Sequence, residues 1–449
     1  MYKDKWLANE KVFRDPVHNY IQITHQLILD LIDTKEFQRL RRIKQLGGSS
    51  YTFHGGEHTR FSHSLGVYEN ARHICDIFSR KYPIEKEGEN GWDDSERLVT
   101  LAAALLHDIG HGAYSHTFEQ IFHTNHEEFT AEIILSEKTE INAVLQKMGI
   151  DFPQKVASVI QKTYPNPQVV QMISSQIDAD RMDYLLRDAY FTGTQYGFFD
   201  LTRITRVIRP YKDGIAFLSQ GMHAVEDYIV SRYQMYMQIY FHPTSRAMDV
   251  LLVHLLKRAK FLYNAGGRAD LFLATSPRLI PFLKGDYNLY DYLKLDDGVL
   301  NTYFSEWSED VDEILSDLAK RYRNRKPLSS IIVKDEKEHL LPTMRRFVEE
   351  FGYNADYYTI TSSSMNLPYD FYRPNDTHSL TQIEIMRKDG TLVELSTLSP
   401  LVRAITGESV GDRRFFFPKE MLQKTDGQLD LLEDVTLKFQ KHVHNGELV

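Results

Sequence analysis

The sequence predicts a mainly α protein with a smaller C-terminal α+β lobe. Apolar residues at helical spacing fill most of the chain before Pro327, and short strand-like runs follow it, such as 381–386 and 391–396. The intervening Arg387–Thr391 is a strong signal for a hairpin turn. A chain of 449 residues also exceeds one ordinary core. We therefore expect two units, 1–326 and 327–449.

The elements follow from the same patterns, taken in order. The alternation at Tyr20, Ile21 and Ile23 predicts a short strand or an ordered arm, and the turn residues Lys212 to Gly214 predict a hairpin. The expected helices are 25–45, one starting near His63, one in the apolar run that begins at Leu98, and 126–148, 154–163, 168–191 and 223–264. The expected strands after Pro327 are 329–333, 356–361, 381–386 and 391–396.

Composition limits the function classes. The net charge of −9 and the pI near 6.1 disfavour nucleic acid as the main partner. Cys75 is the only cysteine, so no intramolecular disulfide forms and a reducing compartment is expected. The N-terminus has no apolar signal-peptide segment, and no apolar run has the length of a membrane span. We expect a cytoplasmic protein without a membrane partner.

The chain is organised around Leu98 to His126, where an apolar, alanine-rich run ends in metal- and phosphate-binding side chains. Five of the 18 histidines fall in this window, and His107 is followed directly by Asp108. A lone histidine on such a helix is usually structural, but a His-Asp pair followed by Gly110-His111-Gly112 is rarely so. Two ligands do not make a tight site, so other helices must supply more donors.

The missing metal ligands have few candidates. His63 begins its own predicted helix, and the acid is one of Asp178, Asp180 and Asp183. A mixed histidine and carboxylate set suits divalent ions such as Mg, Mn, Fe, Zn or Co.

Two helices carry polar stripes. Asp180, Tyr184 and Asp188 share one face of 168–191, and Arg232, Tyr236 and Tyr240 repeat that spacing on 223–264. The first stripe suits a pocket that holds a metal at one end and a hydroxyl group at the other, although a solvated face has the same pattern. Tyrosine stripes are more often core. The basic run 35–44 is read either as a solvated helix face or as a phosphate-binding patch.

These segments together resemble a known family. His63, His107-Asp108 and Asp180 match the H…HD…D signature of the HD metallophosphohydrolase superfamily. The flanking segments resemble the HD-type deoxynucleoside triphosphate triphosphohydrolases, with the chain similar to shorter bacterial members rather than to the animal enzyme with its extra sterile-alpha-motif domain. The matching segments are KVFRDPVHNYI, FQRLRRIKQLGG, HTRFSHSLGV, HDIGHGAYSH, IDADRMDYLLRD and 236–242.

The resemblance implies a helical HD core with a smaller α+β lobe, and metal-dependent hydrolysis of a dNTP to the deoxynucleoside and inorganic tripolyphosphate. It implies that the metal ligands are His63, His107, Asp108 and Asp180. The implied catalytic residues are Asp108, His111 and the general acid His126, with Glu119 where the family commonly has an aspartate beside that acid. The implied substrate contacts are Gln45, Leu46, Arg60, His111, His116, Arg181, Tyr184, Asp188, Tyr236 and Tyr240.

Regulated members of the family also bind nucleotides between subunits, which drives assembly of tetramers. The resemblance therefore implies a homotetramer with a guanine nucleotide effector, dGTP or GTP. Asp33 is an acceptor-only carboxylate, which fits the N1–H and N2–H donors of guanine. The implied effector-binding residues are Lys11, Val12, Asp33, Gln38, Arg41, Phe53, Arg203, Arg232 and His242.

Two other function classes remain open at this stage. One is an HD-type nucleotidase or phosphodiesterase, which Arg60, His116 and Arg181 disfavour because they would face a triphosphate. The other is a nucleotide-sensing or single-strand nucleic-acid binding protein, which the complete ligand set and the acidic balance disfavour.

Overall fold

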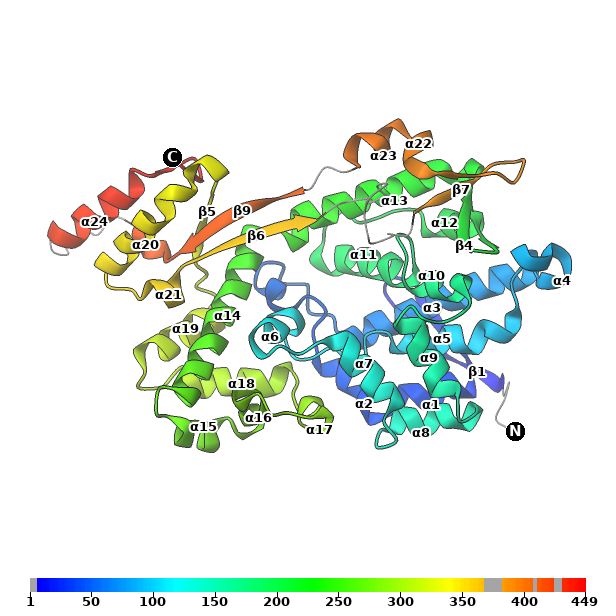
Figure 1. Cartoon of the computed structure of the whole chain (residues 1–449), viewed down its shortest axis with the longest axis horizontal. Coiled ribbons are helices and arrows are strands. Elements are labelled where there is room, and N and C mark those ends of the chain that lie inside the picture. Colours follow the sequence, from blue (N-terminus) through cyan, green and yellow to red (C-terminus); the bar gives the residue numbers. More distant parts are fainter. Residues whose placement is uncertain (1–5, 367–381, 407–409, 424–429) are drawn as a thin grey trace.

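The structure is a computed structural model and describes residues 6–366, 382–406, 410–423 and 430–449. Helices dominate it, which confirms the predicted fold class, and small sheets lie at the N-terminus and around the C-terminal part (Figure 1). A large hydrophobic core runs through the helices from Ile21 to Phe416, and a smaller one lies under the C-terminal sheet. Among the described residues, no helix combines the length and apolar character needed to cross a membrane.

The N-terminal arm is an antiparallel pair, β1 (Trp6–Asp15) and β2 (Asn19–His25). The predicted alternation holds on the inner face of β2, where Ile21 and Ile23 are buried. The turn requires a positive φ of 62° at Asn19, a residue type that tolerates this region. The arm carries His18 toward the helical core.

Three helices form the centre of the core: α3 (Arg60–Lys81), α5 (Arg97–Leu106) and α11 (Ala179–Thr192). Helix α3 packs against both of the others. Every residue of α5 is buried, because its run of leucine and alanine has no polar face. The helix ends at His107, so the chain leaves the core where its polar residues begin.

Four predicted helices are interrupted. The segment 126–148 forms α7 (His126–Leu135), α8 (Glu140–Leu145) and a short 3-10 turn (Gln146–Met148), because the Thr139 side chain caps α8 by accepting from the Asn142 amide. The segment 25–45 splits into α1 (Gln26–Ile32) and α2 (Lys35–Arg39), because the Thr34 side chain caps α2 by accepting from the Phe37 amide. The segment 168–191 splits into α10 (Pro167–Ile173) and α11, because Asp178 caps α11 through the Arg181 amide. The predictions of single helices were wrong, but Asp180, Tyr184 and Asp188 still share α11.

The predicted helix 223–264 is also interrupted. It forms α13 (Met222–Met235), a π-helical turn (Tyr236–Tyr240) and α14 (Pro243–Asn264). Pro243 cannot donate a helical hydrogen bond, and the His242 side chain caps the new helix. The Arg232 guanidinium still lies over the Tyr236 ring at 5.8 Å, and the Tyr236 and Tyr240 rings pack edge to face at 5.1 Å.

The chain beyond Pro327 contributes strands to two sheets (Figure 1). A five-stranded sheet has the order β10-β11-β5-β9-β6, and a four-stranded sheet has the order β3-β4-β7-β8. In the second sheet the predicted hairpins β3–β4 and β7–β8 join through parallel pairing of β4 with β7. In the predicted strand 356–361, Asp356–Tyr358 lie in a helical turn instead, because Asn354 caps it. The division at Pro327 stays a prediction.

The remaining bounds complete the architecture. The strands are β3 (Ile208–Tyr211), β4 (Gly214–Leu218), β5 (Ser329–Ile332), β6 (Ile360–Asn366), β7 (Glu384–Met386), β8 (Leu392–Glu394), β9 (Val410–Phe417), β10 (Val443–His444) and β11 (Glu447–Leu448). The helices not yet given are α4 (Ile84–Glu87), α6 (Ser115–Phe122), α9 (Phe152–Ile160), α12 (Leu201–Val207), α15 (Ala269–Thr275), α16 (Ile280–Lys284), α17 (Leu289–Leu293), α18 (Asp297–Trp307), α19 (Glu313–Arg323), α20 (Leu341–Glu350), α21 (Ala355–Tyr358), α22 (Leu395–Leu398), α23 (Pro400–Ile405) and α24 (Asp430–Gln440).

Candidate metal centre and substrate cavity

One cavity of about 560 Å³ gathers most of the residues singled out in the sequence. Its walls come from the loop before α3, the segment after α5, and helices α11 and α14 with the π-turn between α13 and α14. The predicted residues that line it are Gln45, Leu46, Arg60, His63, Asp108, His111, His116, His126, Asp180, Tyr184, Asp188, Tyr236 and Tyr240. His107 lies directly behind this wall, and Arg181 does not line the cavity.

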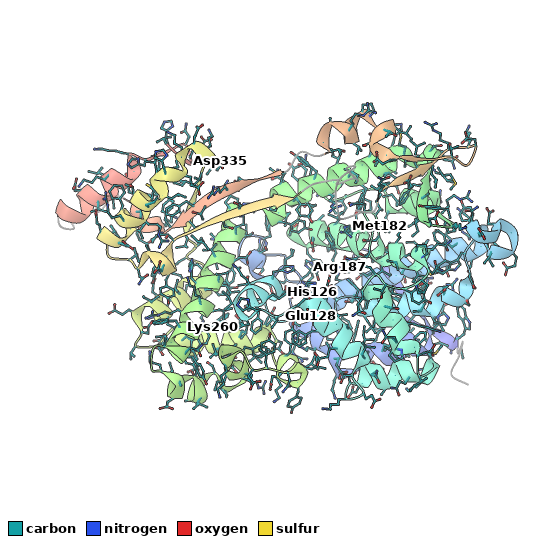
Figure 2. All side chains as sticks on the ribbon, in the orientation of Figure 1. His126, Glu128, Met182, Arg187, Lys260 and Asp335 are labelled. Atoms are coloured by element: carbon teal, nitrogen blue, oxygen red, sulfur yellow. The ribbon has the colours of Figure 1, made fainter. Side chains whose placement is uncertain are left out.

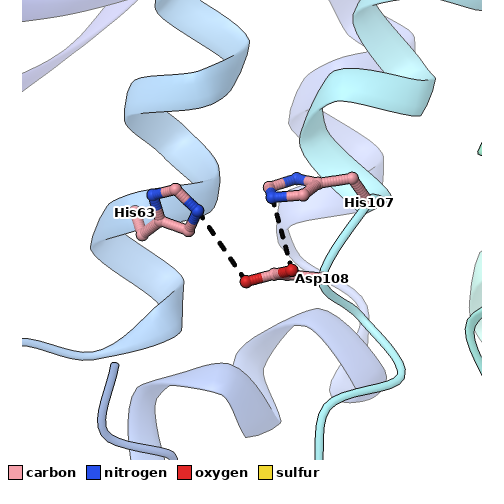
Figure 3. Close-up of side chains that lie close together, drawn as sticks. All are labelled: His63, His107 and Asp108. Atoms are coloured by element: carbon pink, nitrogen blue, oxygen red, sulfur yellow. Dashed lines mark ion pairs between the residues drawn. The ribbon is translucent and has the colours of Figure 1, made fainter. Parts of the chain in front are cut away.

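His63, His107, Asp108 and Asp180 converge at the base of the cavity (Figure 3 shows the first three). The Asp180 Oδ1 atom lies 3.1 Å from His63 Nε2 and 3.6 Å from His107 Nε2. The Asp108 oxygens lie 3.4 Å from His107 Nε2 and 3.8 Å from His63 Nε2. Ligand atoms about 2.1 Å from one ion stand roughly 3.0–3.4 Å apart, so small adjustments give these four groups a common ion.

The tautomers of the two histidines fit metal binding. His107 Nδ1 donates to the Ala104 carbonyl at 2.9 Å, which leaves Nε2 as an acceptor. That Nε2 atom is buried and has no hydrogen-bond partner. His63 Nδ1 lies 2.8 Å from Asp183 Oδ2, so its Nε2 also faces the cluster. Each of these two histidines thus has its second nitrogen fixed by an acceptor, an arrangement typical of histidines that bind metal.

The electrostatics of the cluster favour a cation. Burial by itself lowers the pKa of His63, but hydrogen bonds with Asp180 and Asp183 raise it to about 10. Burial raises the pKa of Asp108, yet His107 and Arg60 hold that pKa well below its usual value. The donor set and its negative potential fit a divalent metal ion.

Asp183 lies outside the group of four residues and holds the His63 ring in position. Its two oxygens contact His18 Nε2 at 2.7 Å and His63 Nδ1 at 2.8 Å, and they accept from the guanidinium of Arg187. Arg187 also pairs with Asp15 of the N-terminal arm and is fully buried (Figure 2 labels it). From its sequence position Asp183 was only a candidate metal ligand, because the contacts from the arm at His18 and Asp15 are not visible in local spacing.

A second cluster joins His111, His116, His126 and Glu119. The rings of His111 and His126 stack at 3.9 Å, and Glu119 Oε1 lies 2.7 Å from His126 Nδ1. Since Glu119 also accepts from the His126 amide, it fixes both backbone and ring. Burial and the nearby Arg60 lower the pKa of His111 to about 3, so this ring is neutral near pH 7. His116 is exposed at the rim.

The two arginines expected to meet phosphate differ in position. Arg60 is buried, pairs with Asp108 through Nη1, and donates from Nη2 to the Ser115 hydroxyl at 3.2 Å. Its Nε atom has no hydrogen-bond partner. Arg181 pairs instead with Asp178, the residue that caps α11. Arg60 therefore provides a cationic side chain within the cavity.

The opposite end of the cavity carries hydroxyl and carboxylate groups. Tyr240 donates to Asp188 Oδ2 at 2.7 Å, and His58 Nε2 lies 2.7 Å from Asp188 Oδ1. The sequence analysis missed His58, which reaches Asp188 from the loop before α3. Nearby, Gln45 Oε1 is buried and has no hydrogen-bond partner. The oxygen atoms of Asp188 and Gln45 are therefore the hydrogen-bond acceptors at this end of the cavity.

Asp249 of α14 also lines the cavity and was missed. Burial raises the pKa of its carboxyl to about 7, while the nearby His116 opposes this shift. The helix was recognised in the sequence, but nothing in its spacing indicated that this acid faces His116.

The residues implied for effector binding lie outside this cavity. Lys11, Val12, Asp33 and Arg41 are exposed, and Arg41 lies over the Phe61 ring at 3.5 Å. The remaining positions make four separate contacts. Phe53 packs edge-on against His242 at 5.5 Å, Arg203 donates to the Gln220 carbonyl, Gln38 donates to the Ile32 carbonyl, and the buried Arg232 donates to Gln176.

Comparisons with known proteins agree with this geometry. The family model of the HD domain matches residues 60–188, and that of the HD associated region matches residues 199–262. The uncharacterized protein YwfO of Bacillus subtilis is 48% identical over 94% of this chain and 95% of its own. A solved phosphohydrolase from Bacteroides thetaiotaomicron has a TM-score of 0.75 and 29% identity, covering 91% of this chain and 100% of its own.

A His/Asp metal cluster on this helical core defines an HD-type phosphohydrolase. The chain belongs to the HD-domain family and carries the HD-associated region. It is also similar to the Dictyostelium discoideum homolog of the deoxynucleoside triphosphate triphosphohydrolase SAMHD1, at 26% identity over 73% of this chain and 62% of the relative.

Proposed function

We propose that this protein hydrolyses deoxynucleoside triphosphates to the deoxynucleoside and inorganic tripolyphosphate. The observation that carries the proposal is a single cavity with a metal cluster at its base, Arg60 and histidines on one side, and the Asp188–Tyr240 pair at its far end. Its volume of about 560 Å³ is in the range of small-molecule sites. The similarity to the SAMHD1 relatives supports the choice of substrate.

In this reaction water attacks the α-phosphorus, and the bond from that atom to the 5′-oxygen breaks. A divalent ion held by His63, His107, Asp108 and Asp180 would supply Lewis-acid activation of the phosphoryl group and of water. His126 gives a proton from Nε2 to the departing 5′-oxygen. Glu119, with its Oε1 atom 2.7 Å from His126 Nδ1, orients the ring.

The other residues bind and select. Arg60 and His116 meet the phosphate chain, with the neutral His111 donating or accepting a hydrogen bond beside them. Asp188 accepts from the 3′-hydroxyl, and Tyr240 fills the space that a 2′-hydroxyl would need. Gln45, Leu46, Tyr184 and Tyr236 complete the walls. Arg181 reaches phosphate after release from Asp178.

The product of turnover tests the proposal. The metal-loaded protein is incubated with each dNTP, alone and with dGTP or GTP, and the products are resolved by anion-exchange chromatography. Equal amounts of tripolyphosphate and deoxynucleoside are expected. Pyrophosphate or orthophosphate as the first product would contradict the proposal and indicate another HD-type nucleotidase or phosphodiesterase. Tight single-strand binding without turnover would indicate a sensing protein.

We expect Asp188→Asn to lower kcat/KM for a dNTP roughly 10- to 100-fold. The charged acceptor of the 3′-hydroxyl is lost, and such a hydrogen bond contributes about 1.5–3 kcal/mol. The measurement repeats wild type and variant with a 2′,3′-dideoxynucleotide, which has no 3′-hydroxyl. The penalty should largely disappear with that substrate. An equal penalty on both substrates would refute the contact.

Asp249 predicts a pH dependence of substrate binding. Its raised pKa of about 7 makes it neutral below pH 7 and negative above, where it repels a triphosphate. KM should therefore rise between pH 6 and pH 8, and Asp249→Asn should reduce that rise. KM is measured at both pH values for wild type, this variant and the exposed-site control Asp270→Asn. A rise of the same size in Asp249→Asn would show that another group causes it.

We further propose that a guanine nucleotide activates a homotetramer through the site of Lys11, Val12, Asp33, Gln38 and Arg41. Asp33→Ala should abolish activation by GTP and leave bound metal unchanged, because Asp33 is exposed and far in sequence from the ligands. Initial rates against GTP concentration and sedimentation velocity check both parts. Undiminished activation in Asp33→Ala would eliminate this site.

A further inference from the structure

The basic residues of the run 35–44 lie in different surroundings. Arg41 lies over the Phe61 ring, and Lys44 pairs with Glu57 at 2.6 Å. Lys35, Arg39 and Arg42 instead line a second cavity, separate from the metal centre. The interpretation of this run as a phosphate-binding patch therefore applies to the three residues that line the second cavity.

This second cavity has a volume of about 750 Å³ and lies between α2, the connection from α7 to α8, and α17. Lys138 and Lys294 add two further cations to its wall. Lys35 and Arg42 already pair with Glu140 and Asp296. In the part of the chain that the structure describes, no carboxylate pairs with Lys138 or Lys294. The cavity thus has positive charge in excess of its two acids, Glu36 and Glu132.

Arg39 is the deepest cation in this wall, with 2% of its surface exposed. Nη1 donates to the carbonyl of His111 at 2.8 Å, and Nε donates to the carbonyl of Leu295 at 3.2 Å. Nη2 is buried without a hydrogen-bond partner. No carboxylate among the described residues lies within ion-pair distance, so this buried charge is incompletely compensated. Burial correspondingly lowers the pKa of Arg39.

The rest of the wall limits the size and type of a ligand. Glu36 is buried, and its Oε2 atom also has no partner, so it can accept from a hydroxyl or amino group. Tyr290 is 69% exposed and lies beside Leu289 and Leu293, and Lys294 Nζ lies 3.8 Å from the centre of its ring. The cavity thus has an aromatic and apolar side with a cation against it. Cations bind phosphate, a carboxylate accepts from a hydroxyl or amino group, and an aromatic ring packs against a base. A ligand with all three groups is a nucleotide.

We propose that this cavity is a second nucleotide-binding site, with the phosphates at Arg39, Lys138 and Lys294 and the base against Tyr290. The site is independent of Asp33 and of the metal cluster. Arg39 also donates to the His111 carbonyl, so one side chain joins the wall of this cavity to the backbone of the segment that carries His111. The proposal does not depend on which reaction the metal centre performs.

Binding of ADP, measured by isothermal titration calorimetry in metal-free buffer, tests the proposal without turnover. Lys138→Ala/Lys294→Ala should weaken ADP binding at least 10-fold. The matched control is Lys320→Ala/Lys441→Ala, which removes two exposed lysines elsewhere and should leave the affinity unchanged. Thermal melts of both double variants confirm that they fold.

Two further measurements identify the ligand class. Pyrophosphate should bind more weakly than ADP, and Tyr290→Ala should weaken ADP but not pyrophosphate. Saturable ADP binding that both double variants retain equally would overturn the site. Pyrophosphate binding as tight as that of ADP would overturn the assignment to a nucleotide, and no ADP binding by wild type would overturn the proposal altogether.

Discussion

We expect Asp108→Ala to lose bound metal and turnover together, with activity falling at least about 1000-fold. Asp108 lies at the centre of the site, because its oxygens face His63, His107 and His111 and also pair with Arg60. Removing it deletes one ligand and leaves the buried Arg60 guanidinium close to the remaining ligands, where its charge repels a cation. Metal content by inductively coupled plasma mass spectrometry and the product assay measure the two losses.

The control for this variant is Asp270→Ala, which removes an exposed carboxylate of α15. It should keep wild-type metal content and activity. Full metal occupancy in Asp108→Ala, or turnover within a few-fold of wild type, would refute the assignment of the metal site.

Asp183→Asn should lower both stability and metal affinity. Asp183 accepts from the buried Arg187 and contacts the buried His63 and the half-buried His18. Breaking a buried ion pair of this kind costs about 3–5 kcal/mol. Loss of the acceptor that orients a ligand histidine lowers metal affinity roughly 10- to 100-fold. Chemical unfolding and metal titration measure the two effects.

The loss of stability at acid pH tests whether Asp183 stabilises the fold as a charged group. Burial raises the pKa of Asp183, but Arg187, His18 and His63 hold it well below the usual value. Its contribution is therefore present above the pKa of the unfolded chain, near 4, and is lost as pH falls through the folded-state pKa. The wild type should lose more stability than Asp183→Asn below pH 4. The free energy of unfolding is measured against pH for both proteins and for the exposed-site control Asp286→Asn. An equal loss of stability below pH 4 in the wild type and in Asp183→Asn would contradict this role of Asp183.

Local patterns predicted the features that depend on sequence neighbours. The leucine- and alanine-rich run before His107 predicted a buried helix, and α5 is buried on all sides. The turn at Asp389-Gly390 predicted the β7–β8 hairpin, which forms with a positive φ at Gly390. The three residues at i, i+4 and i+8 on α11 line one cavity because the helix continues without a break from Ala179 to Thr192.

Features that depend on long-range contacts were not predicted. The caps at Thr34 and Asp178 are local contacts, but they too were missed, because apolar spacing continues through both positions. Contacts of His18 with Asp183 and of His58 with Asp188 join residues more than 100 positions apart. These pairs form because distant segments of the chain pack against α11. The periodicity of a single segment gives no information on that packing.

In the proposed reaction water attacks the α-phosphorus of a deoxynucleoside triphosphate, which separates it from hydrolysis at the β- or γ-phosphorus. The most direct measurement is turnover of a dNTP in ¹⁸O-labelled water, followed by mass spectrometry of both products. The account predicts tripolyphosphate with one ¹⁸O atom and an unlabelled deoxynucleoside. Label in orthophosphate or pyrophosphate, or in the 5′-hydroxyl of the deoxynucleoside, would contradict it.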